Sequence, residues 1–251
     1  MWPPGAMRTV ALSGRLCSNG RRRKAVTMPK RIVLFGGTFD PIHHGHLIAA
    51  RSVAEFFHFE KVTLIPAAVA PHKLVGRGGR TGARPRELTA GEHRLEMVRL
   101  AVEGEGLFEV SDVELRRPQP SYTFDTLMAY RQEHGLEVEL CWVIGADMLE
   151  DLPAWHRADE VVDMARIITA SRPPHSRRVE SILEKLRLRF SPEQVSRLAG
   201  GLVETPLIDI TSTQLRRRVR EGKAVSFLTP APVWRYMAQH GLYGRPGDSR
   251  T

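Results

Sequence analysis

Hydrophobic and polar positions alternate along this chain with two periods, one typical of strands and one typical of helices. Short apolar runs predict six strands, and most segments between them repeat apolar residues at helical spacing. The strands are expected at residues 31–36, 61–66, 107–113, 138–144, 165–170 and 206–210. Strands that alternate with helices indicate an α/β fold built on a doubly wound parallel sheet.

Turn and capping residues mark several ends of the predicted helices. Thr89 with Glu92, and Ser191 with Gln194, have the spacing of a capping box. Gly135 follows the helix expected from Thr123 and is interpreted as its C-terminal stop. Because ligands of doubly wound folds bind beyond the carboxyl ends of the strands, segments that follow strands are candidate site segments.

The segment after the first predicted strand combines a glycine turn with closely spaced imidazoles. Gly36-Gly37-Thr38 leads towards His43-His44-Gly45-His46, and an apolar helical pattern follows. The first turn of a helix has free N–H groups and the positive end of the helix dipole, which suits a phosphate group. We expect Gly36 and Gly37 to take dihedral angles closed to other residues, and His43 and His46 to face the same anion.

Plainer interpretations of this string are an ordinary glycine turn, surface histidines or metal ligands. The two cysteines of the chain, Cys17 and Cys141, have no metal-ligand spacing relative to these histidines. That argues against a zinc site, and no residue is assigned to a metal. The order of strand, glycine turn, histidines and helix favours the phosphate site.

Charge is distributed unevenly along the 251 residues, whose net charge is +9. Residues 1–28 contain six Arg and Lys residues and no acidic residue, which leaves +3 for the rest. We expect this basic tail to be disordered. It could come from a start codon assigned too early, or be a disordered arm or an Arg-rich targeting peptide, and we favour the first explanation. A single domain is expected over residues 29–244, with a short disordered tail at 245–251.

The remaining composition suits a cytoplasmic enzyme. Hydrophobic residues make up 42% of the chain, which is enough for a substantial core. No run approaches the roughly eighteen apolar residues that span a bilayer. Two cysteines cannot form a disulfide framework, which indicates a reducing cytosol.

Six further segments follow in the order found in one enzyme family. Together with the first string, whose His43, Gly45 and His46 match an H-x-G-H box, they resemble the nucleotidyltransferase superfamily. The later segments narrow the resemblance to nicotinate-nucleotide adenylyltransferases, over about residues 30–244. These segments are Pro71-His72-Lys73, Pro120-Ser121-Tyr122-Thr123, Ile144-Gly145-Ala146-Asp147, Pro153-Ala154-Trp155, Ser171-Arg172-Pro173 and Ile210-Thr211-Ser212-Thr213-Gln214-Leu215-Arg216.

The resemblance implies a Rossmann-like nucleotidyltransferase fold and an in-line adenylyl transfer. The phosphate of nicotinate mononucleotide would attack the α-phosphorus of ATP, giving nicotinate adenine dinucleotide and pyrophosphate in NAD biosynthesis. The resemblance also implies that His43 and His46 contact the ATP phosphates, whereas Gly36, Gly37 and Thr38 form the turn beside them. Mg²⁺ is expected to arrive with ATP, because magnesium usually keeps water and phosphate ligands.

The segment around Ser212 is a second candidate phosphate site. Ser212 or Thr213 can cap a helix, and Arg216, one turn further, can bond phosphate oxygens with its forked guanidinium. The alternative is a plain helix cap before an exposed basic face. The family has serine where this chain has Thr211, which is a mild departure.

Asp147 and Lys73 are candidate nucleotide contacts. The carboxylate of Asp147 can accept hydrogen bonds from ribose hydroxyls, and Gly145 lets a nucleotide approach the backbone. Asp147 could instead cap a short helix over 148–152. Lys73 is expected at the mononucleotide phosphate, although alone it is typical of a surface lysine. Residues 74–88, with four arginines and four glycines, could form a lid or a surface loop.

Tyr122, Thr123 and Trp155 are candidates for binding the acceptor base. An aromatic ring offers a flat surface to a pyridine, and hydroxyl or N–H groups can donate to its carboxylate. The resemblance adds Arg172 to the substrate-binding residues. Tyr122 and Trp155 could instead be packing residues, which is the role we expect for Trp142 in its apolar strand.

Two other classes of function compete with this interpretation. Pantetheine-phosphate adenylyltransferases and glycerol-phosphate cytidylyltransferases share the first motif but not the segments around Tyr122 and Trp155. A basic nucleic-acid-binding protein is disfavoured, because no RNA-binding signature is present and the basic excess lies largely in the tail. The expected partners are ATP and nicotinate mononucleotide, with no nucleic acid and no membrane. A homo-oligomer and a preference for the acid over the amide mononucleotide are left open.

Overall fold

The computed structural model describes residues 30–68, 88–118, 120–171 and 179–244, and within them a six-stranded sheet has the order β3-β2-β1-β4-β5-β6. Every neighbouring pair of strands is parallel. The winding direction therefore switches between β1 (Arg31–Gly37) and β4 (Glu139–Gly145), where ligands of doubly wound sheets bind. The expected fold class is confirmed.

The remaining elements follow in an alternating order along the chain. The other strands are β2 (Val62–Pro66), β3 (Phe108–Val110), β5 (Arg166–Ser171) and β6 (Leu202–Glu204). The helices before β5 are α1 (His44–Phe57), α3 (Gly91–Val102), α4 (Thr123–His134), α5 (Ala146–Asp151), the short 3₁₀ turn η2 (Leu152–Ala154) and α6 (Ala158–Met164). The later helices are α7 (Val179–Leu186), α8 (Pro192–Ala199), α9 (Ser212–Arg220) and α10 (Ala231–Gln239).

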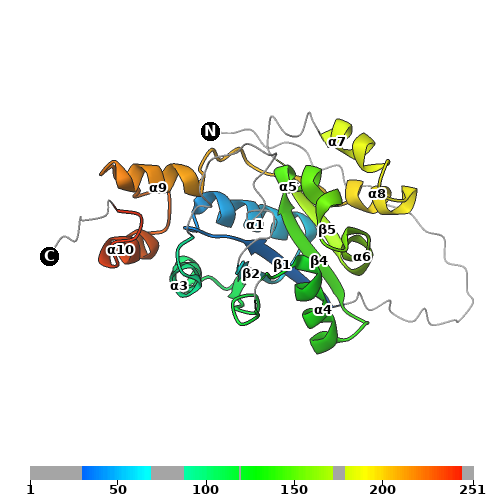
Figure 1. Cartoon of the computed structure of the whole chain (residues 1–251), viewed down its shortest axis with the longest axis horizontal. Helices are drawn as coiled ribbons and strands as arrows, with labels where there is room; N and C mark the ends of the chain where they lie inside the picture. Colours follow the sequence, from blue (N-terminus) through cyan, green and yellow to red (C-terminus); the bar gives the residue numbers. More distant parts are fainter. Residues whose placement is uncertain (1–29, 69–87, 119, 172–178, 245–251) are drawn as a thin grey trace, which may run out of the picture.

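Helices cover both faces of the sheet, because successive strand residues point to opposite faces (Figure 1). On β1, Val33 and Phe35 join the core formed with α1, α3 and α10. Leu34 joins the second core, formed with α4 to α8. Trp142 lies in that second core and is 4% exposed, which confirms its expected packing role.

The sixth predicted strand is wrong. The sheet ends with β6, in which Val203 lies opposite Ala170 of β5, and residues 206–210 contain no strand. Pro206 cannot donate a ladder hydrogen bond, and Leu207 is 59% exposed, so this segment has no face to bury. The third strand is also shorter than expected, because only Phe108–Val110 pairs with β2.

The predicted helix ends are confirmed in two of three places. The Ser191 hydroxyl accepts from the Gln194 N–H, and the Gln194 side chain accepts from the Ser191 N–H. Gly135 ends α4 with φ +79°. The capping box expected at Thr89 is wrong, because α3 begins at Gly91 with Ala90 as its N-cap. The Thr89 carbonyl instead accepts from the Arg94 side chain.

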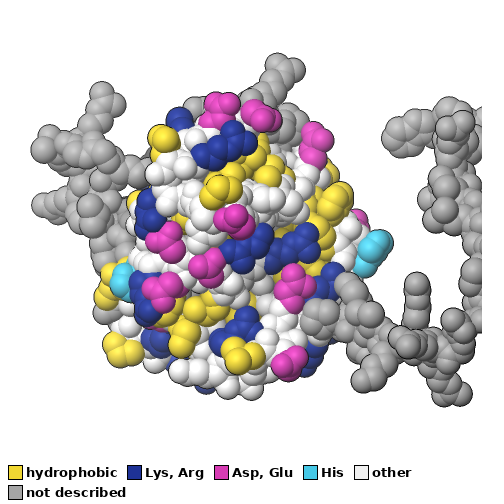
Figure 2. Space-filling model, turned by 90° about the vertical axis from the view of Figure 1, so that its right-hand side faces the viewer, with side chains coloured by type: hydrophobic (Ala, Val, Ile, Leu, Met, Phe, Trp, Pro, Cys, Tyr) yellow, Lys and Arg dark blue, Asp and Glu magenta, His cyan; other side chains and the backbone are white. Residues whose placement is uncertain are grey.

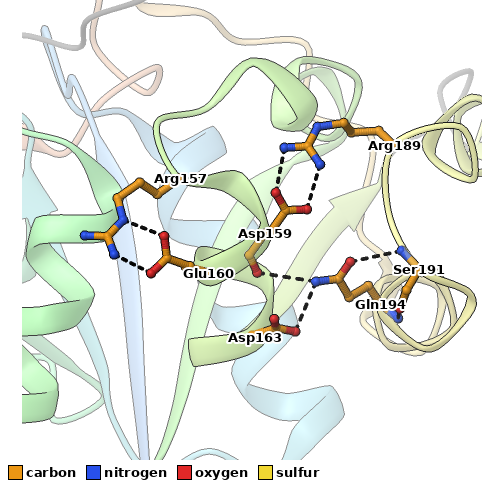
Figure 3. Close-up of polar contacts among 7 residues, drawn as sticks. All are labelled: Arg157, Asp159, Glu160, Asp163, Arg189, Ser191 and Gln194. Atoms are coloured by element: carbon orange, nitrogen blue, oxygen red, sulfur yellow. Dashed lines mark hydrogen bonds and ion pairs between the residues drawn. The ribbon is translucent and has the colours of Figure 1, made fainter.

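Charged side chains of both signs share the outer surface near α6 and α8. On the face shown in Figure 2, Lys and Arg side chains lie beside Asp and Glu side chains. Figure 3 shows polar contacts that join α6 to α8 and to the turn before it: Arg189 donates two hydrogen bonds to Asp159, and Gln194 donates to Asp163.

The expected tails at 1–28 and 245–251 lie outside the described residues, as do residues 74–87. Among the residues that are described, no helix combines the length and the apolar character needed to cross a membrane.

Candidate functional site

Residues 38–43, which join β1 to α1, are called the motif loop. Gly36 and Gly37 end β1, and neither has a positive φ, so the expectation of dihedral angles reserved for glycine is wrong. Glycine is required at both positions because a side chain would not fit. An added Cβ would lie 2.6 Å from the Trp142 ring at Gly36 and 2.6 Å from the Phe39 ring at Gly37. The left-handed residue of this segment is Phe39, with φ +46°.

The two predicted catalytic histidines lie side by side at the start of α1. His43 is the N-cap residue of α1, and its backbone N–H donates to Nδ1 of His46 at 3.3 Å. The two rings are stacked with centroids 3.7 Å apart. A Cβ on Gly45 would lie 3.0 Å from Nδ1 of His43, which explains the glycine of the box.

Phe39 helps to set the orientation of His46. Its ring meets the His46 ring edge-on, with centroids 5.1 Å apart, and is 1% exposed. The unusual backbone of Phe39 therefore places a large apolar ring against the His46 imidazole. Strained backbone of this kind persists only where the surrounding packing holds it.

Side chains from distant elements bind the carbonyl groups of the motif loop. The Thr38 carbonyl accepts from Arg94, and the Asp40 carbonyl accepts from Arg216 at 2.6 Å. The Pro41 carbonyl accepts from Ser212 at 2.9 Å, and the Ile42 carbonyl accepts from Thr229 at 2.7 Å. The loop conformation is thus set by donors from α3, α9 and the segment before α10.

The second predicted phosphate segment lies directly against this loop. Thr211 is the N-cap of α9, because its hydroxyl accepts from the Gln214 N–H, so the expectation that Ser212 or Thr213 caps the helix is wrong. The Thr213 hydroxyl accepts from the guanidinium of Arg216, a buried residue that is 7% exposed. The N-termini of α1 and α9 therefore meet at one place. A direct contact of Arg216 with phosphate stays a prediction.

Arg94 is a site-forming residue that the sequence interpretation missed. It is 2% exposed, and its guanidinium donates to the carbonyls of Thr38, Ala67, Ala68 and Thr89. Burial lowers the pKa of Arg94, and the nearby Asp40 carboxylate opposes that change. An arginine one turn before the apolar Met97 and Val98 is a signal that could have identified it as buried.

Gly145 and Asp147 lie where β4 ends beside β1. Gly145 is the N-cap of α5, and Asp147 is an exposed residue of its first turn. A Cβ on Gly145 would lie 2.6 Å from the Asp147 carboxylate, so glycine leaves room for that side chain. Asp147 does not cap a helix over 148–152, because the helix begins at Ala146. Its contact with ribose stays a prediction.

The acceptor candidates gather at the start of α4 and after η2. Tyr122 is the N-cap of α4, and Thr123 is its first residue. The Tyr122 ring packs against the His156 ring with centroids 4.4 Å apart. Because His156 directly follows Trp155, this contact brings Trp155 close to the start of α4. Trp155 is half-buried and also packs against the second core, so the structure is compatible with both of its expected roles.

A buried carboxylate supports the start of α4. Glu114 is 4% exposed and accepts from the Thr126 hydroxyl at 2.9 Å. Burial raises the pKa of Glu114, whereas the Thr126 hydrogen bond and the Arg117 charge oppose that rise. Arg117 also donates to Thr126. Nothing in the sequence spacing had marked Glu114 as part of the site.

Two of the predicted substrate contacts belong to segments that the structure does not describe. Lys73 and Arg172 lie outside the described residues. The other candidates all lie on segments at the carboxyl edge of the sheet, because helices that cross back over a parallel sheet begin at that edge.

Comparisons with known proteins agree with this arrangement. The cytidylyltransferase-like family model matches residues 34–218. A relative from Thermomicrobium roseum, named "Probable nicotinate-nucleotide adenylyltransferase", is 39% identical over 213 residues, which are 85% of this chain and 91% of the relative. A relative of the same name from a Roseiflexus species is 41% identical over 212 residues, 84% of this chain and 97% of the relative.

A solved structure shows the same fold. The nicotinic acid mononucleotide adenylyltransferase of Plasmodium falciparum, complexed with NaAD, has a TM-score of 0.63 at 18% identity over 85% of this chain and 97% of that chain. At this identity the likeness concerns the fold alone. Together with the sequence relatives, the family model and the site at the switch point of the sheet, it leads to one assignment. The chain belongs to the cytidylyltransferase-like family and, within it, to the nicotinate-nucleotide adenylyltransferases.

Proposed function

We propose that this chain transfers the adenylyl group of ATP to nicotinate mononucleotide. The observation that carries the proposal is the meeting of the N-termini of α1 and α9 at the motif loop, with His43 and His46 stacked on each other at the start of α1. Two helix N-termini and two imidazoles offer donors and positive potential to a chain of phosphates. The relatives supply the choice of acceptor.

The reaction follows from these groups. An oxygen of the mononucleotide phosphate attacks the α-phosphorus of ATP, the bond from that phosphorus to its bridging oxygen breaks, and pyrophosphate leaves with the electron pair. His43 and His46 donate to phosphate oxygens as negative charge grows in the transition state. The turn at Gly145 and Asp147 receives the nucleotide, and Tyr122, Thr123 and Trp155 receive the pyridine. The chain acts by positioning rather than as a nucleophile.

The residues at this site fit an Mg²⁺ ion that binds together with ATP rather than one held by protein ligands alone. Within the described residues, no three His, Cys, Asp or Glu side chains lie close enough together to hold an ion. The donors at the motif loop are imidazoles and a guanidinium, which suit phosphate oxygens rather than an Mg²⁺ ion. When bound with ATP, the ion would neutralise charge on those oxygens and keep water ligands.

One assay with separate arms tests the proposal. The purified chain is incubated with Mg²⁺, either ATP or CTP, and either nicotinate or nicotinamide mononucleotide, and both dinucleotide and pyrophosphate are measured. We expect product with ATP and nicotinate mononucleotide. Product with CTP, or none with either mononucleotide, would contradict the proposed substrates, and the ratio of the rates with the two mononucleotides measures the preference for the acid over the amide.

A further inference from the structure

Tyr243, close to the end of the described chain, contacts the motif loop across 203 residues of sequence. Its hydroxyl donates to a carboxylate oxygen of Asp40 at 2.7 Å. Tyr243 follows α10 and has φ +65°, in the left-handed region that few residues other than glycine adopt. A conformation of this kind requires surroundings that hold it in place.

Asp40 is a buried residue without an assigned role in the reaction. It is 1% exposed, and its backbone carbonyl accepts from Arg216. The carboxylate lies near Arg94, which binds the carbonyl of Thr38 two residues earlier. Asp40 therefore connects three elements to the loop: α3 through Arg94, α9 through Arg216 and the C-terminal segment through Tyr243.

The Tyr243 hydroxyl has little freedom to leave this position. The Thr89 side chain also hydrogen-bonds the phenol, and Thr89 itself binds Arg94 through its carbonyl. The C-terminal segment is further fixed to the loop where the Ile42 carbonyl accepts from Thr229 and the His44 N–H donates to the Leu228 carbonyl. A hydrogen bond to a buried charged group is stronger than one between neutral groups, so the Tyr243 contact should hold the Asp40 side chain in one orientation.

We propose that Tyr243 is a positioning residue of the phosphate site: its hydroxyl fixes the Asp40 carboxylate and, through Asp40, the motif loop that presents His43 and His46. Tyr243 itself does not touch a reacting atom. The effect on rate rests on the proposed function, whereas the effect on the loop does not. Loss of the hydroxyl should therefore disturb both the mobility of the loop and the turnover number.

The chain offers a matched control for this experiment. The Tyr236 hydroxyl, also in the C-terminal segment, makes a 2.8 Å hydrogen bond to Nδ1 of His93 on α3 rather than to Asp40. Tyr243→Phe and Tyr236→Phe each remove one hydroxyl and keep the ring. We expect Tyr243→Phe to lower kcat about tenfold, which equals about 1.4 kcal/mol, and Tyr236→Phe to leave kcat within about twofold.

Hydrogen exchange provides the second readout. In the full chain, backbone amides of residues 38–47 should exchange about threefold faster or more in Tyr243→Phe, and at the wild-type rate in Tyr236→Phe. Equal melting temperatures for the two variants would separate positioning from general destabilisation. Unchanged exchange, or an unchanged kcat in an active enzyme, would overturn the proposal.

The Asp40→Ala variant, which removes the acceptor of the Tyr243 hydroxyl, tests whether Tyr243 acts through Asp40. If Tyr243 acts through the Asp40 side chain, adding Tyr243→Phe to Asp40→Ala should lower kcat by less than about twofold, because the acceptor of the Tyr243 hydroxyl is already gone and coupled residues are not additive. A full tenfold loss in that background would show that Tyr243 acts by another route and would overturn this mechanism. If the wild-type chain makes no dinucleotide at all, the proposed function fails, whereas the exchange comparison still tests the positioning of the loop.

Discussion

The stacked pair of His43 and His46 concentrates hydrogen-bond donors at the first turn of α1. Their rings lie 3.7 Å apart, and the His43 N–H already donates to His46, which holds Nδ1 of His46 towards the backbone. Each ring also has an Nε2 atom, which is the group suited to a phosphate oxygen. The pair is therefore expected to act on charge that grows during phosphoryl transfer.

Replacing His46 by alanine should lower kcat by about a hundredfold or more while the fold is kept, because one preorganised donor to the transition state is lost. Steady-state kinetics at saturating ATP gives the measurement. His134→Ala on α4, far along the chain from the motif loop, is the control and should retain wild-type kcat. An unchanged kcat in His46→Ala would exclude His46 from catalysis.

Trp155 has a different expected role, because it lies beside the start of α4 rather than at the motif loop. Trp155→Ala should raise the KM for nicotinate mononucleotide about five- to a hundredfold, since stacking of a base on an aromatic ring contributes roughly 1–3 kcal/mol. The KM for ATP should change little, and Trp155→Phe should recover part of the loss. Equal defects toward both substrates with a lower melting temperature would indicate a packing residue.

At the scale of elements, Arg94 fixes the ends of β1 and β2 to the start of α3. Its four carbonyl acceptors lie in the loops after the two strands and just before the helix. A single buried guanidinium can hold three segments together because its planar group has five donors.

Arg94→Met should lower the free energy of unfolding by about 3–5 kcal/mol, because several buried carbonyls lose their donor. Urea unfolding provides the measurement. Arg99→Met on the same helix is the control: its side chain is 56% exposed and lies 3.8 Å from Glu96. That change should cost less than about 0.5 kcal/mol. Similar losses in both variants would contradict the role assigned to Arg94.

The capping box of α8 is an element whose contribution can be measured apart from catalysis. Ser191→Ala removes the acceptor of the Gln194 N–H and should lower the free energy of unfolding by about 1 kcal/mol. Ser196→Ala, at an exposed position of the same helix, should be close to neutral, and kcat should be unchanged in both variants. A neutral Ser191→Ala would show that the ion pairs in Figure 3 hold this helix without its cap.

At the scale of the whole molecule, burial of ionisable groups makes stability depend on pH. Burial raises the pKa of the Cys141 thiol from its ordinary value near 9.0 to about 12. Below the pKa of the thiol in the unfolded chain, the folded and the unfolded chain both keep the proton, so the free energy of unfolding does not change. Above it the unfolded chain loses a proton that the folded chain keeps, and stability falls as pH rises toward the folded pKa.

The free energy of unfolding should therefore fall more steeply with pH in the wild type than in Cys141→Ala, by about 1 kcal/mol between pH 8.5 and pH 10. Urea unfolding at several pH values is the measurement, and this window limits the contribution of tyrosines, which ionise at higher pH. Parallel curves for the two proteins would show that Cys141 ionises alike in both states.

Much of the fold followed from local patterns. Five of the six predicted strands and the doubly wound class are present, because buried parallel strands are continuous apolar runs whatever their neighbours are. The sixth strand was misplaced because an apolar stretch at 206–210 resembles a strand, although Pro206 and the exposed Leu207 cannot join the sheet. The sixth strand is Leu202–Glu204 and not 206–210, and only its pairing with β5 in the folded chain shows this.

The sequence alone was enough to assign the family and to place His43 close to His46, because both depend on motifs whose residues are near each other along the chain. The tertiary structure decided which groups hold that motif in place. Arg94, Thr229 and Tyr243 contact the motif loop from segments 56 to 203 residues away. No local pattern specifies such contacts, because they exist only after the packing of helices on both faces has brought those segments to one edge of the sheet.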